Sequence, residues 1–238
     1  IERDPQYSFI RGDICDPEAA ARAMSGCEAV LNFAAESHVD RSIADASDFV
    51  MTGVVGVRVL LDAARKAGVR RFVQIGTDEV YGSLREGSAG EDAPLSPSSP
   101  YAAAKAAGDL LALAYFTTYG LPVVATRSSN NYGSFQHPEK LIPLFITNGF
   151  EGKPLPLYGD GRNVRDWIHV LDNCRAIDLV LRGGAPGEIY NIAGGSELRN
   201  ADIARMITAG LDIPEDRIVP VAVVQRPRNE GNGGALVH

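Results

Sequence analysis

The sequence predicts an α/β fold built on a doubly wound parallel sheet, with a second, smaller lobe toward the C-terminus. Short runs of β-favouring residues alternate with helical stretches of ten or more residues, the order that gives parallel βαβ units with right-handed crossovers. The apolar run RFVQIG at 71–76 is followed directly by a polar turn, TDEVYG at 77–82. Open α/β sheets bind ligands at the carboxyl ends of their strands, so a site is expected at this turn.

The elements of the first part follow from residue periodicity and from their end signals. Asp16 and Pro17 are typical of a helix start, and Gly68 and Gly120 are typical of helix ends. In chain order we predict a strand over 7–14, a helix over 17–25, a strand over 28–35, a helix over 44–67, a strand from residue 71, a polar loop over 83–99, a helix over 100–119 and a strand over 121–127. A loop as long as 83–99 is expected to be mobile or to cover a site.

After Asn131 the alternation loosens, which predicts a second lobe interleaved with the last elements of the first. The expected elements are a helix over 138–151, a Pro- and Gly-punctuated segment over 153–163, a helix over 171–182, a strand over 188–193 and a helix over 200–209. A glycine-rich phosphate loop between a strand and a helix is missing from the sequence. Either the protein binds no dinucleotide, or that loop lies upstream of Ile1.

Charge and composition narrow the function classes. The 23 basic and 30 acidic residues give a net charge of −7, which argues against a nucleic-acid or membrane surface. Cys15, Cys27 and Cys174 form no Cys-x-x-Cys pair and are expected to be thiols in a reducing compartment. The four histidines show no metal-ligand spacing, so no metal site is predicted. No apolar run reaches transmembrane length and no signal-peptide pattern is found, so the expected location is cytoplasmic.

Two groups of residues carry candidate chemistry. Thr77, Asp78 and Glu79 deliver a hydroxyl and two carboxylates at a strand end, where acid–base chemistry is possible; the alternative is an ordinary solvated acidic pair. Tyr101 and Lys105 lie four residues apart on a predicted helix, so the ammonium is expected to lower the pKa of the phenol. The alternative is a tyrosine packed on the sheet beside a solvated lysine.

Seven stretches together carry a family resemblance. They are GDICD at 12–16, FAAESHVDRSI at 33–43, TDEVYG at 77–82, SPYAAAK at 99–105, SNNYG at 129–133, PEKLIP at 138–143 and PLYGDGRNVRDW at 156–167. On these motifs the chain resembles the extended short-chain dehydrogenase/reductase family and, within it, the dTDP-glucose 4,6-dehydratases. Related epimerases carry small residues where Asp78 and Glu79 stand, and related decarboxylases resemble Thr-Ser-Glu there.

The resemblance implies an NAD-dependent lyase that removes water from dTDP-glucose. Tyr101 would take the proton of the sugar 4-hydroxyl as hydride passes to NAD, with Thr77 bonded to the same oxygen and Lys105 holding the nicotinamide ribose. Glu79 would remove the C5 proton and Asp78 would protonate the leaving 6-hydroxyl, and the hydride would return to C6. Two neighbouring carboxyls with opposite tasks need pKa values that are pushed apart.

The resemblance also implies two binding sets. The cofactor would be bound, in addition to Tyr101 and Lys105, by Asp13, Ile14, Ala34, Ala35, Thr52 and Asn131. The nucleotide sugar would be bound, in addition to Thr77, by Ser37, Asn130, Lys140, Leu141, Pro156, Tyr158, Arg165, Asn200 and Arg226. Arg165 is the expected diphosphate clamp, because guanidinium meets phosphate with two parallel hydrogen bonds. His38 and Trp167 are expected to be structural.

The resemblance assigns residues 1–132 to a Rossmann-like NAD-binding domain whose first strands are missing, with 166–195 returning to it. Residues 133–238 would form a truncated substrate lobe. The sequence departs from the family at Gly53, where Asn is usual, and after Arg226-Pro227. The rival predictions are a UDP-glucose 4,6-dehydratase and an inactive fragment that binds nucleotide sugar. A homodimer is expected through the helices near 44–67 and 101–119.

Overall fold

The computed structural model describes residues 3–37, 39–84 and 87–222. The chain divides into a first compact unit, Ile1–Ser128 with Ala176–Ile192, and a second, Ser129–Arg175 with Ala193–His238. The assignment of the cofactor to the first part of the chain and of the sugar to the second stays a prediction.

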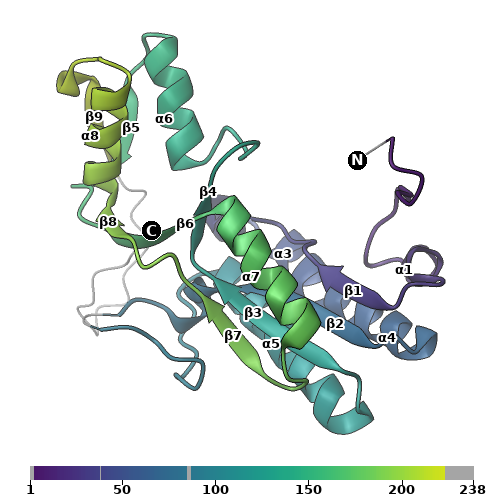
Figure 1. The fold of residues 1–238 in the computed structure, drawn as a ribbon. Helices are drawn as coiled ribbons and strands as arrows, with labels where there is room; N and C mark the ends of the chain where they lie inside the picture. Colours follow the sequence, from purple (N-terminus) through teal and green to yellow (C-terminus); the bar gives the residue numbers. More distant parts are fainter. Residues whose placement is uncertain (1–2, 38, 85–86, 223–238) are drawn as a thin grey trace. The chain divides into compact units, whose positions relative to one another are not determined.

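A four-stranded parallel sheet forms the centre of the first unit, in the order β1-β2-β3-β7 (Figure 1). Its strands are β1 (Ala29–Asn32), β2 (Arg71–Thr77), β3 (Val123–Ser128) and β7 (Ile189–Ile192). β2 is paired on both sides, with Val73 opposite Leu31 of β1 and Val124 of β3. The predicted α/β fold with a parallel sheet is confirmed.

The helices that begin and end within this unit lie between residues 17 and 119, and capping signals in the sequence mark one helix start and two helix ends. They are α1 (Pro17–Met24), α2 (Val39–Ala44), α3 (Ser47–Val50), a π-helical stretch (Met51–Gly56), α4 (Val57–Ala67), a 3₁₀ helix (Asp78–Tyr81) and α5 (Pro100–Tyr119). The Asp16 carboxylate accepts the N–H of Glu18 at 2.9 Å, which caps α1. Gly68 and Gly120 adopt left-handed backbone at φ 66° and 69°, which ends α4 and α5.

The core of the first unit fixes the position of α5. α5 packs on β2 and β3 and against α4, and both helices lie behind the sheet in Figure 1. Leu61 of α4, Ala112 of α5 and Phe72 of β2 are fully buried in one apolar cluster. This cluster holds the C-terminal half of α5 against the start of β2, and the hydrogen bond from Lys105 to the Ile75 carbonyl holds the N-terminal half near the carboxyl end of the strand.

The second unit has its own small core. Its elements are β4 (Asn130–Tyr132), α6 (Leu141–Phe150), β5 (Leu155–Tyr158), β6 (Val164–His169), β8 (Glu197–Arg199), α8 (Asn200–Gly210), a 3₁₀ helix (Glu215–Arg217) and β9 (Ile218–Val221). Helix α7 (Val170–Gly183) begins in this unit and continues in the first. Phe145, Leu155 and Ala204 are buried together and join α6, β5 and α8.

Two predicted elements need correction. Residues 7–14 form no strand, and the side chains of Tyr7, Phe9 and Ile10 are exposed, Phe9 to 73%. A strand needs a neighbour for its backbone hydrogen bonds, and no described strand pairs with this segment. The single helix predicted over 44–67 is α3, the π-helical stretch and α4 in succession.

No helix in the described ranges 3–37, 39–84 and 87–222 combines the length and the apolar character that a membrane crossing requires.

Candidate active site

Thr77, Asp78 and Glu79 form one local structure at the carboxyl end of β2. Thr77 is the last residue of the strand, and the two acidic residues begin the 3₁₀ helix. The Thr77 hydroxyl donates to Asp78 Oδ1 at 3.3 Å and accepts the N–H of Glu79 at 3.3 Å. The hydroxyl therefore caps the turn that presents both carboxylates.

Tyr101 is brought to the same place by the start of α5. The Ser99 hydroxyl accepts the N–H of Ala102 at 3.1 Å, and this cap begins the helix just before Tyr101. The Tyr101 phenol is hydrogen-bonded to Thr77, and its ring lies edge-on to Phe49 at 6.3 Å between centroids. The structure thus joins the two groups of residues that the sequence separates by a loop.

The pKa of Tyr101 is raised, and burial is the main cause. The charge of Glu79 raises it further, while the hydrogen bond to Thr77 lowers it. The prediction that Lys105 lowers this pKa is wrong for the structure. Lys105 Nζ instead donates to the Ile75 carbonyl at 2.5 Å, and the charges that act on the phenol are carboxylates.

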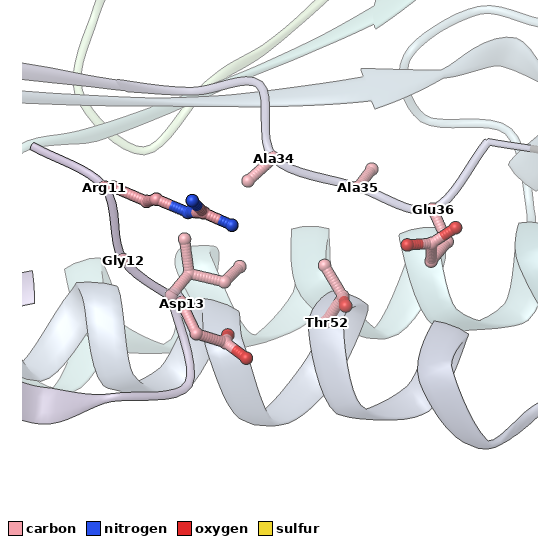
Figure 2. A pocket seen from close by; sticks show the side chains of 8 residues that line it. Arg11, Gly12, Asp13, Ala34, Ala35, Glu36 and Thr52 are labelled. Atoms are coloured by element: carbon pink, nitrogen blue, oxygen red, sulfur yellow. The ribbon is translucent and has the colours of Figure 1, made fainter. Parts of the chain in front are cut away.

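A cavity of about 560 Å³ in the first unit is lined by most of the residues predicted to bind the cofactor (Figure 2). They are Asp13, Ile14, Ala34, Ala35 and Thr52. Arg11, Gly12 and Glu36 complete the lining and were not predicted. Figure 2 shows the Arg11 side chain reaching across the cavity toward Ala34. Arg11 directly precedes the quoted motif at 12–16, and Glu36 lies within the quoted motif at 33–43, so their places in the sequence are the signal that could have found them.

The chemistry of this lining suits a nucleoside. Ala34, Ala35 and Ile14 offer small and apolar surface for a flat base, and the carboxylates of Asp13 and Glu36 can accept hydrogen bonds from amino or hydroxyl groups. Asp13 is oriented by its own turn, since its Oδ1 accepts the N–H of Cys15 at 2.8 Å. The residues present fit the adenosine part of a dinucleotide.

The residues predicted to bind the sugar nucleotide belong mostly to the second unit. Asn130 lies in β4, Lys140 and Leu141 at the start of α6, Pro156 and Tyr158 in β5, Arg165 in β6 and Asn200 at the start of α8. Ser37 lies in the first unit and is exposed, and Arg226 lies outside the described residues. Asn131, predicted for the cofactor, also lies in β4 of the second unit.

Burial separates the members of this second set. Leu141 packs against the apolar cluster of the unit, whereas Tyr158 is 53% exposed on β5. The side-chain Oδ1 atoms of Asn131 and Asn200 are buried and have no hydrogen-bond partner among the described residues. Buried amide oxygens normally accept a hydrogen bond, so these two atoms mark places where a ligand or water would complete the structure.

A buried polar network beneath the site was not predicted. Arg127 of β3 donates from Nε to Asp109 Oδ2 at 3.1 Å and from its Nη1 to the Tyr81 hydroxyl at 2.9 Å. The Tyr81 hydroxyl in turn donates to Asn191 Oδ1 at 2.8 Å. Asp109 could have been found from the sequence, because it follows Lys105 by four residues on the same helix face. The described residues contain no group of three or more His, Cys, Asp or Glu that could hold a metal ion.

Comparison with known proteins agrees with this geometry. The model of the NAD dependent epimerase/dehydratase family matches residues 1–193. The chain is 57% identical over 201 residues to a dTDP-glucose 4,6-dehydratase of Streptomyces niveus, covering 84% of the chain and 60% of the relative. A dTDP-glucose 4,6-dehydratase of Streptomyces antibioticus is 52% identical, over 93% of the chain and 66% of the relative. The chain thus spans about two thirds or less of the length of these curated relatives.

Solved structures show the same similarity. DesIV, a dTDP-glucose 4,6-dehydratase from Streptomyces venezuelae with NAD and TYD bound, superposes with a TM-score of 0.92 at 54% identity, covering 93% of this chain and 69% of that one. A UDP-glucose 4-epimerase of Thermus thermophilus in complex with NAD gives a TM-score of 0.83 at 29% identity, over 100% and 78% of the two chains.

Proposed function

Because the chain belongs to the NAD dependent epimerase/dehydratase family, we propose that the full-length protein converts dTDP-glucose to dTDP-4-keto-6-deoxyglucose with loss of water. The observation that carries this proposal is the hydrogen bond that joins Tyr101 to Thr77, beside Asp78 and Glu79. One hydroxyl, one phenol and two carboxylates thus lie together. These groups are the ones needed to oxidise the sugar at C4 and then to eliminate water across C5 and C6. The relatives at 52–57% identity carry the same activity in their names.

NAD is the cofactor in this proposal. The cavity lined by Asp13, Ile14 and Ala34 fits its adenosine part, and DesIV carries NAD. When bound, NAD supplies an acceptor for the C4 hydride and later returns that hydride.

The residues of the chain divide the proton transfers between them. Tyr101 removes the proton of the sugar 4-hydroxyl, and Thr77 hydrogen-bonds the reacting oxygen. The pKa of Tyr101 is raised by burial and by the charge of Glu79, and positive charge brought near the phenol would favour its ionised form. Glu79 then removes the C5 proton, which the 4-ketone has made acidic, and Asp78 protonates the 6-hydroxyl as it leaves as water.

The sugar nucleotide is bound by residues of the second unit in this proposal, with Arg165 on the diphosphate. Support comes from the buried oxygens of Asn131 and Asn200, which have no partner among the described residues. A thymidine nucleotide is favoured over a uridine nucleotide because relatives at 52–57% identity are named as dTDP-glucose 4,6-dehydratases.

A homodimer and a cytoplasmic location complete the proposal. The helices that the sequence predicts to form a dimer surface expose three apolar side chains, those of Val50, Met51 and Leu110. The three cysteines are free thiols, which suits a reducing compartment.

The test is to incubate the full-length protein with dTDP-glucose and, separately, with UDP-glucose, and to follow each by mass spectrometry. We expect loss of one water from dTDP-glucose, and release of NAD when the protein is denatured. Preferential turnover of UDP-glucose would replace the proposed substrate. Binding of nucleotide sugar without NAD or turnover would identify a binding protein in place of an enzyme.

A further inference from the structure

Helix α5 carries three polar residues in one column, and the reaction that the family resemblance implies uses only Tyr101 and, on the nicotinamide ribose, Lys105. Tyr101, Lys105 and Asp109 follow one another at intervals of four residues, so they share one helix face. This face lies on β2: Tyr101 bonds Thr77, and Lys105 bonds the Ile75 carbonyl. The third residue of the column has no assigned task.

Asp109 is completely buried and lies against Gly76, the residue between Ile75 and Thr77. A Cβ atom at position 76 would stand 3.0 Å from both carboxylate oxygens of Asp109. Only Oδ2 has a partner, Arg127 Nε at 3.1 Å, while the buried Oδ1 has no hydrogen-bond partner among the described residues. Neutralising Arg127 does not by itself require the Asp109 carboxylate to lie so close to β2, the strand whose Ile75 carbonyl accepts the hydrogen bond from Lys105.

We infer that Asp109 is a positioning residue for the proposed reaction: its carboxylate keeps the buried Lys105 ammonium charged and directed at the Ile75 carbonyl. Lys105 is only 8% exposed, and a buried ammonium needs a compensating negative charge. Asp109 supplies that charge from one helical turn away, and Arg127 keeps Asp109 ionised from the other side. This inference depends on the proposed function only for the task of Lys105 in catalysis.

The electrostatics of the column agree with the geometry. Burial lowers the pKa of Lys105, and the charge of Asp109 opposes that shift. The other charged side chains described on α5 and on the elements packed against it are Arg41, Asp48, Arg58, Asp62, Arg65, Lys66, Arg71, Asp78, Glu79 and Arg127. Among the described residues, Asp109 is the group whose charge acts on the pKa of Lys105.

The test measures the Lys105 pKa directly, by titrating the ¹³Cε signals of labelled lysines in the full-length protein; the signal that Lys105→Arg removes identifies Lys105. Asp109→Asn is expected to lower this pKa by about one unit, a tenfold change in the protonation equilibrium. Because Asp109→Asn leaves Arg127 buried without a counterion, the double variant Asp109→Asn/Arg127→Met, which removes both charges, is measured as well.

The double variant is expected to be more stable than Asp109→Asn, because it contains no unpaired buried charge at position 127, while its Lys105 pKa stays below that of the wild type. A Lys105 pKa equal to that of the wild type in both variants would show that Asp109 only neutralises Arg127, and would overturn the inference. Because the titration needs neither substrate nor turnover, failure of the proposed function would leave this result readable. If turnover is confirmed, the alkaline limb of its pH profile is expected to move down with the Lys105 pKa.

Discussion

Glu79 acts on the site in two ways, as the proposed C5 base and as a charge beside Tyr101. Glu79→Gln removes both. We expect C5 proton exchange in deuterated solvent to fall by about 100-fold or more, while C4 oxidation stays measurable. The pH dependence of C4 oxidation is expected to move to lower pH, because the charge of Glu79 raises the pKa of Tyr101. An equal loss of exchange and oxidation in this variant would remove the base role from Glu79.

Gly76 is fixed by its neighbours on β3 and α5. A Cβ atom there would lie 2.5 Å from the Thr126 carbonyl oxygen, a distance that the backbone cannot accept without moving. Gly76→Ala is expected to lower the free energy of unfolding in urea by about 1 to 3 kcal/mol. Gly183→Ala is the matched control, because a Cβ atom at position 183 meets nothing within 4 Å. Equal stability of the two variants would contradict the close packing at Gly76.

Asp109 also predicts a pH dependence of stability. Burial raises the pKa of Asp109 to about 6, above its ordinary value of 3.8. The folded state therefore binds a proton at Asp109 more readily than the unfolded state does. The resulting gain in folding stability is complete below pH 3.8, the ordinary pKa, and is lost as the pH rises through about 6. Between about pH 7.5 and about pH 5, the wild type should gain about 1 kcal/mol relative to Asp109→Asn/Arg127→Met in urea unfolding. A parallel pH dependence of the two proteins would contradict the raised pKa.

The sequence indicated which of the proposed reacting groups lie together better than it indicated their protonation. Thr77, Asp78, Glu79 and Tyr101 could be found because a strand end and a helix start are readable from local patterns. The pKa of Tyr101 could not be found, because it depends on burial and on carboxylates that the fold brings from another element. Arg127 was missed for the same reason, since its pairing with Asp109 joins β3 to α5.

At the scale of elements, the loop over 83–99 is attached to the sheet through Asn191 of β7. The Asn191 side chain donates to the Ala89 carbonyl at 3.0 Å and accepts from the Tyr81 hydroxyl at 2.8 Å. The Asn191 backbone N–H donates to Glu91 Oε1 at 2.9 Å. Ala89 and Glu91 of the loop are thus held by the side chain and the backbone of Asn191.

Asn191→Ala is expected to loosen this loop. Loss of the hydrogen bond to the Ala89 carbonyl, about 1 kcal/mol, should raise the open population of the loop by about 5-fold. Limited proteolysis with mass-spectrometric mapping would show faster cleavage within 87–99. Thr117→Ala, which removes an exposed hydrogen bond to the Leu113 carbonyl, serves as the control. An unchanged cleavage rate in Asn191→Ala would show that the loop is held by other contacts.

Two long helices were predicted well, and the shortest strands were not predicted. The helices α5 and α7 were predicted nearly to their ends, because caps and periodicity agree over many residues. Strands β4 and β8 have three residues each, too few for any pattern, and their existence depends on pairing with β6. The segment 7–14 shows the reverse case, in which a β-favouring pattern lacks a described partner strand.

At the scale of the whole molecule, exposed apolar side chains on α5 test the proposed dimer. Leu110 is 56% exposed on α5, and Leu179 is 71% exposed on α7. If the helical side of the first unit forms the interface, Leu110→Glu should reduce the mass in sedimentation equilibrium to that of a monomer. Leu179→Glu, with the same change of charge on another helix, should leave the dimer intact. A monomeric wild type, or dissociation by both variants alike, would contradict this interface.

The column of Tyr101, Lys105 and Asp109 determines where this chain can tolerate insertions and deletions. One residue inserted into α5 between Tyr101 and Asp109 would turn everything beyond it by about 100° and carry the later side chains off β2. One residue inserted into the loop over 83–99 would cost little, because loop closure depends only weakly on length. Insertions and deletions should therefore accumulate in the loop that precedes α5 and be eliminated by selection within the helix.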